Sequence, residues 1–324
     1  MKAVHIKDLE GPSTVSVVDA APPVRKDGDV LIDVHAAGVS FPEVLQSRGR
    51  YQVKPDLPFI PGAEVAGVVA EAPADAAVRV GDRVAALPFL GGFAEQVACS
   101  ADAVFPIPDS LGFEQAAAIP FNYLTAHFAL RRRGRLEPGE TVLVHGAAGG
   151  VGTAVIQVAK AFGAGAVYGV VSTPEKGEMA VAAGADEYVL ADGFKDAIKT
   201  ATGGRGVDLV ADVVGGDRFT DSLRCLAADG RMLVIGFTAG SIPEVKVNRL
   251  LLNNLDVVGV GWGAYALGRP GYLQGQWEDF LPKLSAGAIV PPLGGSYALA
   301  EVRDALEAID NRKAMGKLVL RVRD

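Results

Sequence analysis

Cysteine is almost absent from this sequence. Its 324 residues include only Cys99 and Cys225, which are far apart and outside any CxxC spacing. A disulfide framework or a cysteine-rich zinc site is therefore not expected, and a reducing compartment is the simplest interpretation. The N-terminus, MKAVHIKDLE, also lacks the apolar stretch of a signal peptide, so we expect a cytoplasmic protein.

Positive charge is in deficit as well, because the formal net charge is −7 at pH 7. A general nucleic-acid-binding protein normally carries a basic surface, so this charge argues against that class. The sequence also offers no polybasic patch for an anionic membrane. One short basic run, Arg131–Arg133 with Arg135, is most simply the solvated end of a helix.

One segment could be mistaken for a membrane span, because residues 141–159 contain no Asp, Glu, Lys or Arg. Four glycines interrupt it, at positions 146, 149, 150 and 152, and leucine is scarce. Transmembrane helices have a different composition, so we expect a buried strand, a turn and a helix here.

The chain is long enough for about two domains. Hydrophobic residues make up 49% and charged residues 21%, which allows a sizeable core. The N-terminal third is rich in Gly, Pro and β-branched residues and predicts a compact β-barrel-like domain. Its strand candidates are Val15–Val18, Val30–Val34, Val65–Val69 and Arg83–Ala86.

After about Pro120 the pattern changes, and from Thr141 strands alternate with helices. Such alternation predicts a parallel sheet covered by helices on both faces. The expected strands are Thr141–His145, Ala166–Ser172, Val207–Val213, Arg231–Ile235 and Leu255–Val260, and the expected helices are Gly150–Phe162, Pro174–Ala183 and Arg218–Leu226. The C-terminal part predicts two helices, Tyr272–Ala286 and Leu299–Asn311, and a final strand, Lys317–Val322. No internal repeat is present.

The run Gly146–Gly152, GAAGGVG, fits a dinucleotide fingerprint, with Ala147 in the first small-residue position, then Gly149 and Gly152. The first small residue permits a tight turn, the second lets backbone N–H groups approach a pyrophosphate, and the third lets the helix pack on its strand. The phosphates would lie at the positive end of the helix that begins near Gly150 and Val151. A glycine-rich turn without a ligand is the alternative, but the run follows a buried strand and opens a helix.

The end of the second strand bears on the choice of cofactor. An NAD site usually has Asp or Glu about 20 residues past the glycines. Here Ser172 and Thr173 occupy that position, and Lys176 lies within reach. Hydroxyls and an ammonium suit the 2′-phosphate of NADPH, although Thr173 would also cap a helix that has Pro174 at its first position, and Glu175 counts slightly against NADPH.

Taken together, the motifs resemble those of the medium-chain dehydrogenase/reductase superfamily, specifically its zinc-free quinone oxidoreductase (zeta-crystallin-like) branch. Any one motif is modest, but their order and spacing extend over nearly the whole chain. The segments that carry the resemblance are residues 36–43, 61–67, 80–84, 91–95, 146–152, 212–216, 230–236 and 316–320.

The resemblance implies an α/β fold with two domains. A GroES-like β-barrel would comprise residues 1–121 and 265–324, and a Rossmann doubly wound parallel sheet would comprise residues 122–264. Members of the branch are commonly dimers or tetramers, and the sheet edge near Leu255–Val260 often pairs between subunits. We therefore expect a homodimer or homotetramer.

The resemblance also bears on zinc. Zinc-dependent relatives place Cys, His and Cys around a catalytic metal, and this sequence has Ser40, Ala63 and Phe121 at the corresponding positions. Zinc needs at least three good ligands, so no metal site is expected. The four histidines are expected to be structural or surface residues; they are His5, His35, His127 and His145.

Further site residues follow from the resemblance alone. It implies that Phe41, Thr125 and Phe237 lie near the nicotinamide, that Val214 and Gly215 line the dinucleotide site, and that Lys317 also binds the cofactor. Tyr51 and Ser40 are the candidates for a direct part in the chemistry, although Tyr51 could equally be an amphipathic barrel residue. Two departures are Ser40, where many relatives have Asn, and Ala191, where a Tyr is common.

The expected activity is hydride transfer from NADPH to a quinone. The alternative enzymatic hypothesis is reduction of activated C=C bonds in alkenals or enones, because the same hydride geometry serves quinone reduction and C=C reduction. A CoA thioester would call for a basic patch, and none is evident. A protein that holds NADPH only as a structural ligand is the non-enzyme alternative, and RNA binding is disfavoured by the acidic charge.

Overall fold

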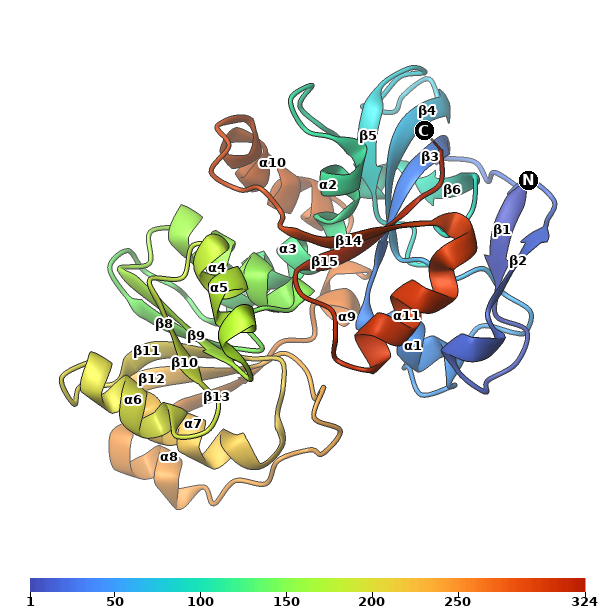
Figure 1. Cartoon of the computed structure of the whole chain (residues 1–324). Coiled ribbons are helices and arrows are strands. Elements are labelled where there is room, and N and C mark those ends of the chain that lie inside the picture. The colour runs from blue at the N-terminus through green and yellow to red at the C-terminus, as the bar shows by residue number, and fades with distance from the viewer. Residues whose placement is uncertain (324) are drawn as a thin grey trace. The chain divides into compact units, whose positions relative to one another are not determined.

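Short β-branched strands separated by Gly and Pro form the unit that contains both ends of the chain. The computed structural model describes residues 1–323, and the chain divides into two units (Figure 1). Unit 1 comprises Met1–Asn122 and the segment from Pro270 onward, whereas unit 2 is the continuous stretch Tyr123–Arg269. The chain therefore leaves unit 1 once and returns to complete it.

Unit 1 is built on a seven-stranded sheet in the order β14-β15-β3-β4-β5-β7, with β6 also paired to β3. The strands of this sheet are β3 (Asp29–Val39), β4 (Glu64–Glu71), β5 (Arg83–Ala86), β6 (Gln96–Ser100), β7 (Val104–Pro106), β14 (Leu293–Ala298) and β15 (Lys317–Arg321). A separate antiparallel pair consists of β1 (Lys2–His5) and β2 (Ser16–Asp19). From Asp29 to Ala36 in β3 buried residues alternate with half-buried ones, as the two-residue period of a strand requires, and the rest of the strand is fully buried. The last strand, β15, pairs antiparallel with β3.

The helices of unit 1 are short except for α10. They are η1 (Pro12–Thr14), α1 (Phe41–Ser47), η2 (Ala101–Ala103), α2 (Phe113–Ala117), α10 (Tyr272–Ser285), η5 (Leu299–Glu301) and α11 (Val302–Asp310). The helix α3 (Pro120–His127) begins at the end of unit 1 and continues into unit 2. The N-cap of α1 is Ser40, whose backbone N–H donates to the Glu43 carboxylate three residues on, at 2.9 Å.

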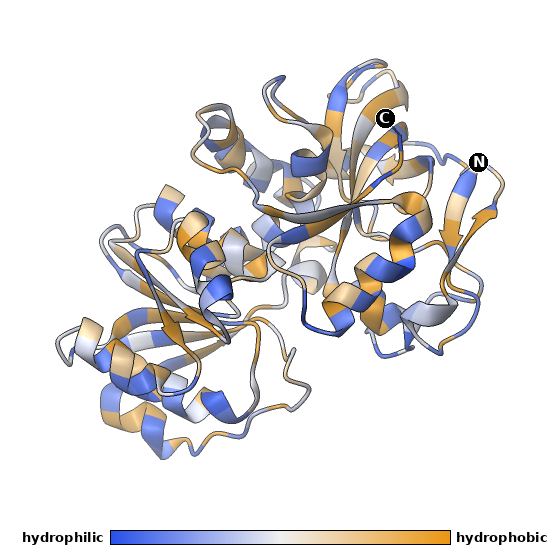
Figure 2. Cartoon of the chain, in the orientation of Figure 1, coloured by the Kyte–Doolittle hydropathy of each residue, from blue (hydrophilic) through white to orange (hydrophobic). Residues whose placement is uncertain are grey.

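Unit 2 is a six-stranded sheet in the order β10-β9-β8-β11-β12-β13, and every neighbouring pair is parallel. The strands are β8 (Thr141–His145), β9 (Ala166–Val171), β10 (Glu187–Leu190), β11 (Val207–Asp212), β12 (Leu226–Val234) and β13 (Asp256–Gly259). This order is that of the doubly wound dinucleotide-binding fold. In Figure 2 these strands are mostly hydrophobic, as expected of a sheet covered on both faces.

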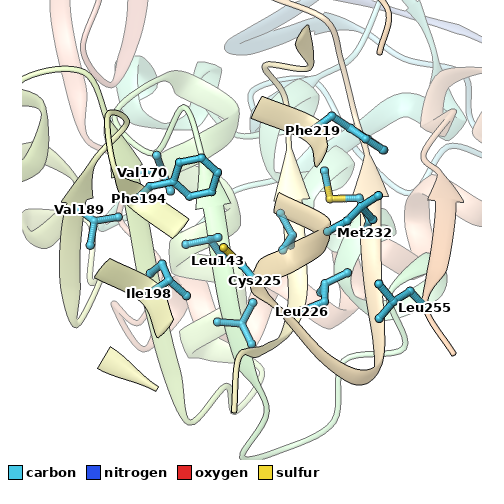
Figure 3. Packing of buried hydrophobic residues seen from close by; sticks show 13 residues of the cluster. Leu143, Val170, Val189, Phe194, Ile198, Phe219, Cys225, Leu226, Met232 and Leu255 are labelled. Atoms are coloured by element: carbon cyan, nitrogen blue, oxygen red, sulfur yellow. The ribbon is translucent and has the colours of Figure 1, made fainter. Parts of the chain in front are cut away.

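The helices of unit 2 connect these strands. They are η3 (Phe128–Arg133), α4 (Gly150–Ala161), α5 (Pro174–Ala182), α6 (Phe194–Ala201), η4 (Gly216–Arg218), α7 (Phe219–Cys225), α8 (Asn248–Asn253) and α9 (Trp262–Ala266). Leu143, Phe194, Ile198 and Met232 belong to one buried cluster between sheet and helices (Figure 3). This cluster fixes α6 and α7 against the central strands.

The sequence predicted most of these elements. Strand Arg83–Ala86 and strand Thr141–His145 have the predicted bounds, and the predicted helices at 150–162 and 174–183 are α4 and α5. The elements that were missed include the strands β1, β6, β7, β10 and β14 and the helices α1, α2, α3, α6, α8 and α9. The strand β10 has only four residues, and both its end residues are exposed, so it carries no hydrophobic period to detect.

Two interpretations of unusual segments can be compared with the structure. Among residues 1–323 no helix is both long and apolar enough to span a bilayer, and the uncharged run 141–159 is divided between β8, a turn and α4. The basic run lies at the exposed end of η3, which is a π-helix. There the Arg131 guanidinium stacks on Phe162 and that of Arg132 stacks on Tyr265.

Candidate functional site

The turn between β8 and α4 is held by a close approach of two backbone segments. Gly146 has a φ of +64°, a conformation that favours glycine. A Cβ atom on Gly152 would lie 2.1 Å from the carbonyl oxygen of Gly146, so no larger residue fits there without a shift. Gly149 is the N-cap of α4, and its own N–H donates to the Gly146 carbonyl at 2.9 Å.

This turn presents the start of a long helix to solvent. Gly149, Gly150 and Val151 are half-buried, whereas Ala147 is fully buried against the sheet. The first N–H groups of an α-helix have no acceptor within the helix, and its N-terminus carries a partial positive charge. The turn can therefore bind an anionic phosphate through backbone N–H groups.

The same turn lies at the point where the strand order reverses. From β8 the chain continues to β9 and β10 on one side, whereas β11, β12 and β13 follow on the other. A Cβ atom on Gly146 would lie 2.8 Å from the Val213 side chain and 3.3 Å from that of Val214. The segments after β8 and after β11 are thus in contact, at the crevice where open α/β sheets bind their ligands.

Asp212 shapes the segment after β11. Its carboxylate is buried and accepts the backbone N–H groups of Val214, at 2.8 Å, and of Gly215, at 2.9 Å. Gly215 has a φ of +67°, and a Cβ atom there would lie 2.9 Å from the Phe237 ring. The structure therefore brings Val214, Gly215 and Phe237 together at one edge of the sheet.

The segment after β9 contains the residues expected to bind the 2′-phosphate. Thr173 is the N-cap of α5, its hydroxyl oxygen accepts the Lys176 N–H at 3.4 Å, and Pro174 is the first helical residue, so the capping interpretation is confirmed. The same hydroxyl hydrogen-bonds to Glu175 and lowers the pKa of that exposed carboxyl. The Thr173 hydroxyl is thus bonded within the first turn of α5, whereas Ser172 is exposed and Lys176 is half-buried.

Two other residues expected near the nicotinamide lie elsewhere in the fold. Thr125 is buried on α3, in unit 2. Phe41 is the first residue of α1 in unit 1 and is half-buried. Their approach to a nicotinamide stays a prediction.

Unit 1 contains a buried ion pair. The Lys317 ammonium, on β15, donates to the Glu64 carboxylate, on β4, and to the Ser40 hydroxyl oxygen. Lys317 is 3% exposed and Glu64 is fully buried. The second carboxylate oxygen of Glu64 accepts the Phe121 backbone N–H at 2.8 Å, so both of its oxygens are bonded.

A second buried carboxylate belongs to the same group. The two oxygens of Glu43 accept the backbone N–H groups of Ser40, at 2.9 Å, and of Ala63, at 3.1 Å. Burial raises the pKa of Glu43 to about 7, although the Lys317 charge opposes this. We call the side chains of Ser40, Glu43, Glu64 and Lys317 the barrel polar cluster.

The barrel polar cluster and the backbone groups bonded to it include the three positions that the family resemblance equates with zinc ligands, Ser40, Ala63 and Phe121. Here Ala63 and Phe121 contribute only backbone N–H groups, which are donors, and Ser40 contributes one hydroxyl that already accepts from an ammonium. These groups do not fit zinc, which needs thiolate, imidazole or carboxylate ligands. Across residues 1–323 no group of three or more His, Cys, Asp and Glu side chains is arranged to hold a metal ion.

Tyr51 follows α1 and is half-buried in unit 1. Burial, and then the nearby Glu43 carboxyl, raise the pKa of its phenol above the ordinary value. The phenol is therefore protonated at neutral pH and can donate a hydrogen bond. An amphipathic barrel residue would have the same properties, so a direct part for Tyr51 in the chemistry stays a prediction.

Three of the histidines pack on aromatic rings, in line with the structural role expected of them. His35 stacks on Phe113, and His127 meets Phe162 edge to face. His145, at the end of β8, meets Phe194 edge to face and forms a 2.8 Å hydrogen bond between its Nε2 and the Ser222 hydroxyl. Both thiols are free and buried, and burial raises the pKa of each to about 12, so they are unreactive.

The imidazole of His145 is held in its neutral form. It is 1% exposed, and its Nδ1 has no hydrogen-bond partner among residues 1–323. Burial lowers its pKa to about 4, although Asp212 acts in the opposite direction. A neutral ring therefore joins the strand before the phosphate turn to α7, which carries Ser222.

The sequence did not identify Asp212, Glu43 and Glu64 as site residues. Each is an acidic residue next to or within an apolar run, and a buried carboxylate needs partners. An acidic residue in an apolar run therefore indicated a buried carboxylate at each position, but the neighbouring sequence did not show which residues would bond to it.

Comparisons with known proteins agree with this architecture. Residues 150–286 match the family described as "Zinc-binding dehydrogenase", and residues 26–109 match "Alcohol dehydrogenase GroES-like domain". Quinone oxidoreductase-like protein 2 of Rattus norvegicus is 39% identical over 322 residues, which cover 98% of this chain and 91% of that protein.

Two solved structures are similar over 99% of this chain. A probable oxidoreductase from Mycobacterium abscessus is 42% identical, with a TM-score of 0.91 and 99% of that chain covered. The quinone oxidoreductase from Thermus thermophilus, solved alone and in complex with NADPH, is 38% identical, with a TM-score of 0.87 and 100% of that chain covered.

The close approach at Gly152 gives a first prediction. Gly152→Ala forces the Gly146 carbonyl to move, and such overpacking costs about 1–3 kcal/mol, so we expect NADPH to bind roughly tenfold to a hundredfold more weakly. The measurement is the Kd from quenching of protein fluorescence. Gly263→Ala on α9 is the matched control, because a Cβ atom there meets open space. Equal affinities for both variants would contradict the assignment of the turn.

The buried imidazole gives a second prediction. Because the pKa of His145 is about 4 in the folded chain, against an ordinary 6.5, the unfolded chain binds the proton more readily. Stability is therefore complete above about pH 6.5 and falls as the pH drops toward 4, by about 3 kcal/mol from this group. Urea unfolding should show a steeper loss between pH 7 and 4 for the wild type than for His145→Gln. Parallel curves would refute the neutral-imidazole assignment.

Proposed function

The chain belongs to the quinone oxidoreductase branch of the medium-chain dehydrogenase/reductase superfamily, and from this membership we propose that it transfers hydride from NADPH to a quinone without zinc. The single observation that carries the proposal is the phosphate turn at the reversal point of a parallel sheet. There Gly146, Gly152 and the start of α4 form a site for a pyrophosphate.

NADPH fits the residues of unit 2. Its pyrophosphate would be bound at Ala147, Gly149, Gly150 and Val151. The 2′-phosphate would lie beside Ser172 and Lys176, where no carboxylate stands at the end of β9. When bound, NADPH supplies a hydride, which carries two electrons and one proton, and the second proton of the hydroquinone comes from water.

Independence from zinc follows from the chemistry of the barrel polar cluster. Two backbone N–H groups and one hydroxyl stand where relatives have metal ligands, and an ammonium fills the space beside them. A quinone accepts hydride with little acid assistance, whereas oxidation of a plain alcohol is disfavoured without a Lewis acid. The cluster therefore supports a quinone over an alcohol as the substrate.

The experiment that tests this function follows NADPH oxidation at its absorbance band, with EDTA present, against a panel of quinones and enones. We expect turnover with quinones. Turnover with enones alone would make the protein an alkenal or enone reductase. Tight NADPH binding without turnover would leave a structural ligand as the role of NADPH, and loss of activity with EDTA would overturn the independence from zinc.

Cofactor preference provides a third prediction, on Lys176. Removal of its charge in Lys176→Ala should raise the KM for NADPH about tenfold, because the ammonium stabilises the 2′-phosphate, and should leave the KM for NADH unchanged. Lys199→Ala, at an exposed position on α6, is the matched control. If both cofactors were affected alike, Lys176 would have no part in the choice between them.

We also propose that the protein is a homodimer that pairs through β13. This strand is the last in the sheet of unit 2, and the neighbouring α8 has no buried residue. Leu251 and Leu252 on α8 are 79% and 75% exposed. An open strand edge beside exposed leucines is typical of a surface that another chain covers.

The dimer is tested by size-exclusion chromatography with light scattering. Leu251→Asp/Leu252→Asp should shift the mass from dimer to monomer, because two charges would be buried in the interface. Val181→Asp, at an exposed position on α5, is the control and should stay dimeric. A wild type of monomeric mass would overturn the proposal.

A cytoplasmic location is proposed as well. It rests on the two buried, unpaired thiols, which suit a reducing compartment. Cell fractionation tests it, and recovery of the protein outside the cytoplasmic fraction would contradict it.

A further inference from the structure

The hydrogen bonds of Ser40 have a defined direction. An ammonium has donors only, so the Ser40 oxygen must accept from Lys317. The Ser40 proton then points away from Lys317. Its acceptor in the structure is a Glu64 carboxylate oxygen at 3.4 Å, which is longer than a normal O–H···O bond. A better-placed acceptor would take this proton in preference to Glu64.

Lys317 is the cation of the barrel polar cluster. Glu64 binds it directly, and the two oxygens of Glu43 are occupied by the backbone N–H groups of Ser40 and Ala63. The ammonium is 3% exposed, so little solvent screens it. In a region of low dielectric such a charge polarises a bonded hydroxyl more strongly than it would in water.

We propose that Lys317 is a positioning residue that acts through Ser40. Its ammonium orients and polarises the Ser40 hydroxyl, which donates a hydrogen bond to the carbonyl oxygen of the acceptor as that oxygen gains negative charge. In zinc-dependent relatives a metal supplies positive charge at the acceptor oxygen. Here Lys317 supplies it indirectly, through the Ser40 hydroxyl. This inference rests on the proposed function, and cofactor binding by Lys317 is the alternative that its test distinguishes.

No covalent change occurs at either residue. When bound, NADPH would supply the two electrons and one proton of the hydride to the quinone and would leave as NADP⁺. Ser40 keeps its proton throughout, and water supplies the second proton of the hydroquinone. The contribution of Ser40 is therefore stabilisation of developing charge, which raises kcat.

The test compares Ser40→Ala, the charge-neutral pair Glu64→Gln/Lys317→Met, and the triple variant. Removing Lys317 alone would leave Glu64 buried and unpaired, which destabilises the fold, so both charges are removed together. For each variant kcat and KM for one quinone are measured at saturating NADPH, and the Kd for NADPH is measured separately. Glu140→Gln/Arg231→Met, which removes a partly buried ion pair of unit 2, is the control.

We expect kcat to fall about tenfold to a hundredfold in Ser40→Ala and in the pair, with the Kd for NADPH within about twofold of the wild type. The triple variant should lose no more than Ser40→Ala, because Lys317 acts only through that hydroxyl. The control pair should keep the wild-type kcat.

Three results would overturn the inference. If the fall in kcat of the triple variant equalled the product of the falls in Ser40→Ala and in the pair, Ser40 and Lys317 would act independently. A weaker Kd with unchanged kcat would make Lys317 a cofactor-binding residue, and an unchanged kcat and Kd would make the ion pair purely structural. Absence of turnover in the wild type is a separate outcome, because it defeats the proposed function and this inference together.

Discussion

The buried ion pair between Glu64 and Lys317 is the interaction on which unit 1 depends. It joins β4 to β15, which are 253 residues apart in the chain at these side chains, and it satisfies a carboxylate that would otherwise be buried at high cost. Around it Ser40 begins α1, and the N–H of Phe121 reaches the second Glu64 oxygen. The same pair that closes the barrel therefore also fixes the Ser40 hydroxyl at the start of α1.

In unit 2 the shape of the phosphate turn depends on a steric constraint, whereas unit 1 depends on an ion pair. The close approach of Gly152 to the Gly146 carbonyl leaves the first turn of α4 against β8, and Asp212 holds the neighbouring segment after β11 through two backbone N–H groups. Both features concern backbone atoms. A phosphate site of this kind requires few specific side chains, which is why related chains can share it while their substrates differ.

Features that depend on residues close together in the chain could be predicted from the sequence, whereas contacts between residues far apart in the chain could not. The turn Gly146–Gly152 and the cap at Thr173 depend on neighbours within a few residues, so their pattern is visible in one segment. The partners of Glu64 are Lys317 and Phe121, and no periodicity links them. The pairing of His145 with Ser222 was hidden for the same reason, since α7 approaches β8 only once the sheet is formed. Lys317 was identified through a family resemblance, but its bonded partners came from the fold.

The insertion of unit 2 within unit 1 has a consequence for biosynthesis. Unit 2 is one continuous segment, Tyr123–Arg269, so its sheet can form while the rest of the chain is still being synthesised. The barrel cannot close until β15 has left the ribosome, because that strand pairs with β3 and brings the Lys317 ammonium. During that interval Glu64 and the edge of β3 lack their partners, so a nascent chain of this protein exposes an incomplete sheet that chaperones would recognise.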